Sequence, residues 1–155
     1  MAVSAHRSRA GSVPVGDLDA ARTFFERRLA CETDAADVAA DLAEGAVDYT
    51  LIDCRARNAY AKAHLPGAIS LPHGEMDRET IAALPEGLLV TYCWGPGCNA
   101  ATQGAQKLLA AGREAKEMLG GFEYWVREGS PVEGRGRGKL AYEKDTTGLV
   151  LVQDD

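Results

Sequence analysis

The sequence of 155 residues contains no apolar run that approaches the roughly 20 residues needed to cross a bilayer. Its N-terminal stretch carries His6, Arg7 and Arg9, but no hydrophobic segment follows them. We therefore expect no secretory signal and place the protein in the cytoplasm. Basic residues are also in deficit, since 17 Lys and Arg against 23 Asp and Glu give a net charge of −6. This balance argues against a nucleic-acid partner, and we expect no membrane partner either.

Closely spaced metal ligands are missing as well. The chain has three histidines and four cysteines, and no two cysteines have C-x-x-C spacing. Structural zinc sites are built from such clustered ligands, so we expect no metal site. A reducing cytoplasm keeps cysteines as thiols, and we expect this state for Cys31, Cys54, Cys93 and Cys98.

Short apolar runs alternate with helical patterns through the middle of the chain. The patterns predict strands at 49–53, 68–71, 88–92 and 115–119, and helices at 58–63, 77–84, 99–111 and 122–128. Strands that alternate with helices indicate a parallel sheet covered on both faces. In such sheets, ligands bind beyond the carboxyl ends of the strands.

The two ends of the chain differ from this central pattern. Apolar residues recur at helical spacing after Asp17, a suitable N-cap, and a second helix is expected to stop at Gly45. We therefore expect four regions: a flexible N-terminal arm (1–16), a helical extension (17–45), an α/β domain (46–133) and a tail (134–155). The tail begins with a connector rich in Gly and Arg, and its two apolar stretches suggest a hairpin.

One thiol stands where a buried strand ends. Cys93 follows the apolar run 88–92, and a glycine-containing loop and a helix follow it. Loop amides and a helix N-terminus favour thiolate over thiol, so we expect a lowered pKa for Cys93. Gly95 and Gly97 allow positive φ, which would turn successive amides inward. Residues 93–103 contain no charged side chain, so backbone dipoles would have to supply the stabilisation.

Three segments in the same order make residues 49–133 resemble a rhodanese domain. Residues 51–55 (Leu-Ile-Asp-Cys-Arg) and 60–69, with a His-x-Pro-Gly-Ala-like stretch, match the first signature of that family. A Val-x-Tyr strand precedes Cys93, and residues 118–132 match the closing signature. The resemblance implies an α/β fold, a rhodanese-like three-layer domain with a central parallel β-sheet of about five strands flanked by helices.

The resemblance also implies a reaction. In rhodaneses the loop cysteine takes a sulfane sulfur from a donor such as thiosulfate, holds it as a persulfide and passes it to a thiophilic acceptor. Carried over, Cys93 is the catalytic residue, and the sulfur anion lies in a loop made of Trp94, Gly95, Pro96, Gly97, Cys98 and Asn99. The implied partners are a small sulfur donor and a thiol acceptor or sulfur-carrier protein. No cofactor is implied, and the oligomeric state stays open.

The end of the loop departs from the family pattern. Many rhodaneses have an arginine or lysine five residues after the nucleophile, where this chain has Cys98. Because that cation is missing, we do not expect the site to prefer an anionic donor such as thiosulfate. The phosphatase relatives of the fold have an arginine one position later, where this chain has Asn99, so phosphatase activity is disfavoured.

Cys98 suggests an alternative function. A thiol beside a persulfide can attack Cys93, release sulfide and leave a Cys93–Cys98 disulfide, which would make the protein a thiol redox sensor or relay. Cys98 can equally be a small residue turned inward, and a non-catalytic regulatory module is a third possibility. Asp53 and Arg55 are expected to form a structural pair near the site. His64 is expected to anchor the turn that follows it.

Overall fold

The computed structural model describes residues 8–135, so the hairpin expected in the tail lies outside the described residues. The chain forms two compact units, residues 1–30 and 31–155. Helix α1 (Leu18–Cys31) makes up most of the described part of the first unit, and none of its residues is buried. Asp17 caps this helix as expected, because its carboxylate accepts hydrogen bonds from the amides of Asp19 and Ala20.

The second unit is built on a five-stranded sheet in which every pair of neighbouring strands is parallel. The strands lie in the order β1-β5-β4-β2-β3. They are β1 (Glu32–Asp34), β2 (Tyr49–Asp53), β3 (Ile69–Ser70), β4 (Leu88–Tyr92) and β5 (Ala115–Leu119). This arrangement confirms the predicted α/β fold with a parallel sheet of about five strands.

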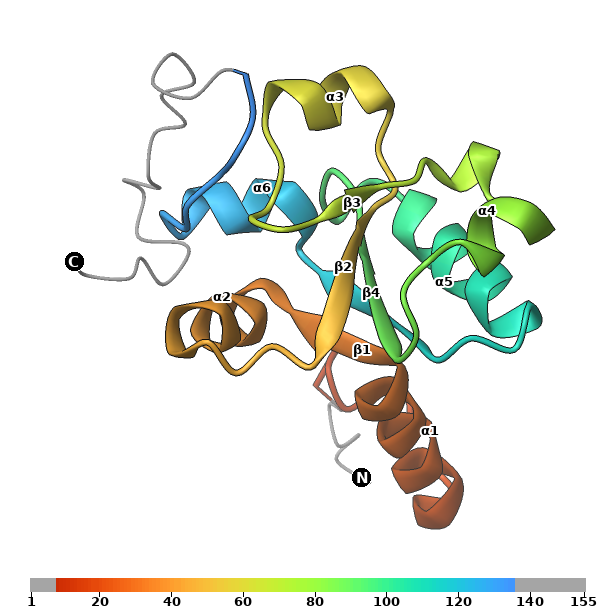
Figure 1. The fold of residues 1–155 in the computed structure, drawn as a ribbon. Coiled ribbons are helices and arrows are strands. Elements are labelled where there is room, and N and C mark those ends of the chain that lie inside the picture. Colours follow the sequence, from red (N-terminus) through yellow and green to blue (C-terminus); the bar gives the residue numbers. More distant parts are fainter. Residues whose placement is uncertain (1–7, 136–155) are drawn as a thin grey trace, which may run out of the picture. The chain divides into compact units, whose positions relative to one another are not determined.

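Helices cover both faces of the sheet, as Figure 1 shows. On one face lie α2 (Ala35–Glu44) and α6 (Gly121–Arg127), and on the other lie α4 (Arg78–Ala82) and α5 (Ala100–Ala110). The shorter α3 (Arg57–Lys62) and the 3₁₀ turn η1 (His73–Glu75) connect β2 to β3 and β3 to α4. Consecutive residues of β2 belong to different hydrophobic cores, because Leu51 packs with Trp125 on one face of the sheet and Ile52 packs with Leu108 on the other.

Strand β1 and the placement of α2 differ from the sequence-based expectation. No strand is predicted before residue 49, yet β1 pairs with the edge of β5 in the register Glu32↔Glu117. Helix α2 begins directly after β1 and buries Ala35 and Val38 in the core that it shares with α6. The structure therefore places α2 in the second compact unit, whereas its helical pattern alone had grouped it with the N-terminal helix.

Candidate active site

The loop after β4 is held by the turn between β5 and α6. The carbonyl oxygen of Cys93 accepts a hydrogen bond from the amide of Phe122 at 2.8 Å, and that of Trp94 accepts one from Glu123 at 2.7 Å. Gly121 has a φ of 58°, and a Cβ at this position would lie 2.6 Å from the Cys93 carbonyl oxygen. Only glycine allows this approach, so the start of α6 fixes the loop through backbone contacts.

The two glycines of the loop do not adopt the positive φ that we expected. Gly95 packs closely against Glu123 instead, and a Cβ there would lie 2.6 Å from a carboxylate oxygen of that side chain and 3.0 Å from its Cβ. A Cβ at Gly97 would meet nothing within 4 Å, and nothing in the structure explains that glycine. The amide of Cys98 donates to the Gly95 carbonyl oxygen at 2.9 Å and closes a turn, rather than joining a ring of sulfur-binding amides.

The side chain of Cys93 is buried but reaches a cavity. It is 3 % exposed and borders a space of about 600 Å³. Its Sγ donates to the carbonyl oxygen of Cys98 at 3.0 Å, and the amides of Gly95 and Ala101 donate to the sulfur. The sulfur therefore has main-chain donors around it and an open space beside it, which a covalent nucleophile requires.

The acidity of Cys93 is the reverse of the sequence-based expectation. Burial raises the pKa of the Cys93 thiol to about 11. The amides of Ala101 and Gly95 lower it, but the Cys98 thiol adds to the increase. The prediction of a lowered pKa is therefore wrong, because loss of solvent outweighs the backbone dipoles at this depth.

Cys98 carries the more acidic thiol of the two. Burial opposes its ionisation, but hydrogen bonds from the amide of Ala100, the thiol of Cys93 and the amide of Trp94 lower the pKa of Cys98 below its ordinary value. The carboxylate of Glu117 acts in the opposite direction. The two thiols are thus in hydrogen-bonding contact, and the proton leaves Cys98 more readily than Cys93.

The cavity is lined by most of the predicted site and by residues of α5, β5 and the turn before α6 that the sequence did not indicate. Apart from the half-exposed Trp94, every predicted loop residue lines it: Cys93, Gly95, Pro96, Gly97, Cys98 and Asn99. Thr102 of α5 and Glu117 of β5 line it too, and the Thr102 hydroxyl donates to a Glu117 carboxylate oxygen at 3.0 Å. Their position near the carboxyl edge of the sheet is the sequence feature that could have placed them at the site.

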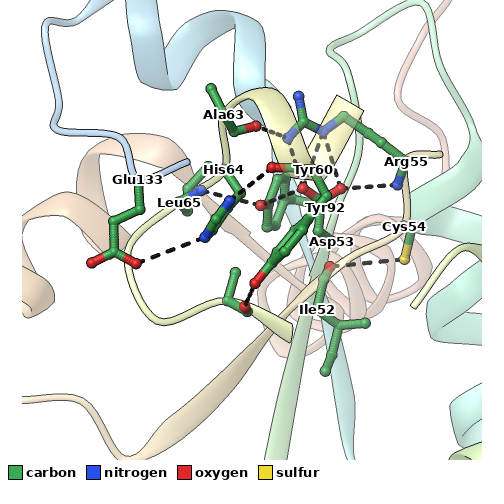
Figure 2. Close-up of polar contacts among 11 residues, drawn as sticks. Ile52, Asp53, Cys54, Arg55, Tyr60, Ala63, His64, Leu65, Tyr92 and Glu133 are labelled. Atoms are coloured by element: carbon green, nitrogen blue, oxygen red, sulfur yellow. Dashed lines mark hydrogen bonds and ion pairs between the residues drawn. The ribbon is translucent and has the colours of Figure 1, made fainter. Parts of the chain in front are cut away.

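A buried ion pair fixes the strand ends beside the site (Figure 2). The Arg55 guanidinium donates to both carboxylate oxygens of Asp53, at 3.0 and 2.7 Å, and to the carbonyl oxygen of Ala63 at 2.6 Å. The hydroxyl of Tyr92, the residue before Cys93, donates to the same carboxylate at 2.6 Å. Asp53 and Arg55 do not line the cavity, which agrees with a structural role near the site.

His64 lies outside the cavity and ties two loops together. Its ring stacks on Tyr60 with centroids 3.8 Å apart, and its Nδ1 lies 2.8 Å from the Tyr60 carbonyl oxygen, as Figure 2 shows. Its backbone pairs with that of Glu133 in an antiparallel bridge. The contacts of His64 are those of an anchor for the connection between α3 and β3.

The other cysteines lie apart from the cavity. Cys54 is buried, and burial raises the pKa of its thiol well above the ordinary value, whereas Cys31 is exposed. Across residues 8–135, no three His, Cys, Asp or Glu side chains form a group that could hold a metal ion. Within the same range, none of the helices combines the length and apolar character needed to span a membrane.

Comparison with solved structures identifies several similar proteins. The BH2092 protein from Bacillus halodurans is 38% identical with a TM-score of 0.72, over 76% of this chain and 87% of that one. The rhodanese-like domain of the Alr3790 protein from Anabaena is 25% identical with a TM-score of 0.63, over 80% and 94%. Thiosulfate sulfurtransferase from Pseudomonas aeruginosa is 25% identical with a TM-score of 0.57, over 70% of this chain and 21% of that one.

A curated relative and a family model complete the comparison. The HTH-type transcriptional regulator Rv0324 of Mycobacterium tuberculosis is 33% identical over 86 residues, which are 56% of this chain. The match covers 38% of that regulator, so the chain spans less than two fifths of the length of this relative. The family model for the rhodanese-like domain matches residues 34–128. With its parallel sheet and its cysteine loop at the carboxyl end of β4, the chain belongs to the rhodanese-like domain family.

Proposed function

We propose that the protein is a sulfurtransferase that moves sulfane sulfur through a persulfide on Cys93. The observation that carries this proposal is the Cys93 sulfur at the cavity wall, with the amides of Gly95 and Ala101 donating to it. Such donors stabilise both the attacking thiolate and the persulfide anion that replaces it. The similarity to a thiosulfate sulfurtransferase supports the same class of chemistry.

Cys98 provides the base for the first step. The lowered pKa of Cys98 keeps a larger share of it as thiolate, and this thiolate, in hydrogen-bonding contact with the Cys93 thiol, takes the proton as Cys93 attacks. A bond forms between the Cys93 sulfur and the outer sulfur of the donor. The bond between that outer sulfur and the rest of the donor breaks, and the donor leaves with the electron pair.

The second step reverses this pattern. A thiolate of the acceptor attacks the outer sulfur of the Cys93 persulfide, and the sulfur–sulfur bond to Cys93 breaks. Cys93 leaves as a thiolate and recovers its proton from Cys98. The protein returns to its starting state, and no external oxidant or reductant enters the cycle.

The experiment is an intact-mass measurement of the reduced protein after incubation with a sulfane-sulfur donor. We expect the gain of one sulfur atom, its removal by cyanide, and no gain in Cys93→Ala. Cys31→Ser is the matched control, because it removes an exposed thiol outside the cavity and should load like the wild type. Equal loading of Cys93→Ala and wild type would refute the proposal.

The contact between Cys93 and Cys98 supports a second candidate, a thiol redox sensor or relay. Attack of the Cys98 thiolate on the inner sulfur of the Cys93 persulfide forms a disulfide and releases the outer sulfur as hydrosulfide. Peroxide produces the same disulfide as it is reduced to water. Unchanged sulfide release in Cys98→Ser would exclude this candidate. A protein that neither loads sulfur nor forms the disulfide is a non-catalytic regulatory module.

A further inference from the structure

We infer that Glu117 makes the cavity select sulfur donors by charge, favouring a persulfide whose organic part carries an ammonium group over an anionic donor such as thiosulfate. The inference rests on the proposed function and adds the class of substrate. It does not follow from the loop sequence, since Glu117 comes from β5.

Glu117 is the one charged side chain among the described residues that line the cavity. It is half-buried, and the Thr102 hydroxyl holds one of its carboxylate oxygens at 3.0 Å. Cys93 and Cys98 line the same cavity. A donor that brings its sulfur to these thiols therefore shares a confined space with a fixed carboxylate.

A second carboxylate lies beside Glu117. Glu32 is the register partner of Glu117 on the neighbouring strand β1. Burial and the charge of Glu32 raise the pKa of Glu117, although the Thr102 hydrogen bond opposes them. The field of Glu117 also reaches the loop, where it opposes ionisation of Cys98. An ammonium group beside Glu117 would be attracted, and an anion would be repelled.

The basic side chains around the loop are engaged elsewhere. Arg55 is paired with the buried Asp53 at 2.7 Å, and Arg127 is paired with Glu123 at 2.9 Å. Lys107 donates to a backbone carbonyl oxygen at 2.6 Å. None of these cations lines the cavity, so an anionic donor would find no cationic side chain among the described lining residues to offset Glu117.

Such a donor transfers its outer sulfur to Cys93 by nucleophilic displacement. The Cys93 thiolate attacks the outer sulfur of R–S–SH and a bond forms between the two sulfur atoms. The sulfur–sulfur bond of the donor breaks, and R–S⁻ leaves with the electron pair. Glu117 binds the ammonium of R in the approach and takes no part in bond making. It is therefore a specificity-determining residue that acts through charge.

The first test compares three persulfides with the same two-carbon spacer, made from cysteamine, 2-mercaptoethanol and 3-mercaptopropionate, whose organic parts are cationic, neutral and anionic. We measure the initial rate at which each loads sulfur onto Cys93. In the wild type we expect the cationic donor to load about fivefold faster than the anionic one, the neutral donor falling between them. Glu117→Gln keeps an oxygen for Thr102 and should make the three rates equal. Glu114→Gln, which removes the same charge from an exposed residue next to β5, should keep the wild-type order.

The second test is independent of sulfur transfer. It labels the cavity thiols with 2-aminoethyl and 2-sulfonatoethyl methanethiosulfonate, which differ in charge. The ratio of the two rates should favour the cationic reagent in the wild type and approach unity in Glu117→Gln. The ratio is the useful quantity, because a change in the pKa of Cys98 alters both rates equally.

The outcomes separate the two proposals. The role of Glu117 is overturned if the loading rates do not depend on donor charge, or if Glu114→Gln changes them as much as Glu117→Gln does. In either case the proposed sulfurtransferase activity is unaffected. Failure of all three donors to load Cys93 overturns the sulfurtransferase and the donor class together. The labelling ratio then shows separately whether Glu117 sets the charge preference of the cavity.

Discussion

At the scale of single residues, the two thiols of the site ionise in different ranges of pH. Burial raises the pKa of Cys93 to about 11, whereas hydrogen bonds from backbone amides and from Cys93 lower that of Cys98. A thiolate exists above its pKa, so iodoacetamide should label Cys98 first as the pH rises, and Cys93 only near pH 11. Peptide mapping by mass spectrometry across a pH series measures both profiles.

The variant Cys98→Ser provides the control for this assignment. It removes a neighbour that raises the pKa of Cys93, so labelling of Cys93 should move to lower pH while burial keeps it above the ordinary range. Identical labelling profiles for the two thiols in the wild type would contradict this order of ionisation.

The ion pair of Arg55 and Asp53 is a stability determinant. Both side chains are almost completely buried, so Asp53→Asn leaves the Arg55 charge without its partner. We expect a loss of about 3–5 kcal/mol in the free energy of unfolding, measured by urea denaturation. Glu75→Gln breaks the exposed pair with Arg57 and should change this free energy by less than about 1 kcal/mol. Similar losses in the two variants would show that burial is not the cause.

At the scale of elements, the contact between α6 and the cysteine loop depends on one glycine. A Cβ in Gly121→Ala would overlap the Cys93 carbonyl oxygen and the Gly95 amide. Gly112 is the matched control, because it also has a positive φ but open space around it. Gly121→Ala should cost about 1–3 kcal/mol more than Gly112→Ala in urea denaturation, and should slow sulfur loading of Cys93. Equal costs would mean that only backbone strain matters.

Local pattern predicts some elements well and others not at all. Strands β2 and β4 have the predicted bounds, because each is an apolar run rich in β-forming residues. Strand β1 has the sequence Glu-Thr-Asp, which contains no apolar residue. It forms a strand because it pairs with β5. A strand that depends on a distant partner leaves no periodic signal.

The same limit applies to the site. The strand, glycine loop and helix around Cys93 are contiguous, so the sequence indicates the nucleophile and its loop. The acidity of Cys93 depends on how deeply the folded chain buries it, which no local pattern records. Glu117 reaches the cavity from another strand, and only the order of the strands brings it there.

At the scale of the whole molecule, the unit of residues 31–155 should fold without the first 30 residues. Its two hydrophobic cores contain no described residue before Ala35, and no residue of α1 is buried. A chain that begins at Cys31 should keep its free energy of unfolding within about 0.5 kcal/mol of the full chain. Urea denaturation and the order of thiol labelling are the measurements, and a larger loss would assign residues 1–30 a stabilising role.

The pairing of β1 with β5 also governs the order in which the molecule is completed on the ribosome. The first strand of the described chain has to wait for the last one before its backbone groups find their partners. Helix α6, whose amides hold the cysteine loop, emerges directly after β5. Cys93 therefore leaves the exit tunnel before the elements that bury it have emerged, and a nascent chain acquires its edge strand and its enclosed thiol at the same stage of synthesis.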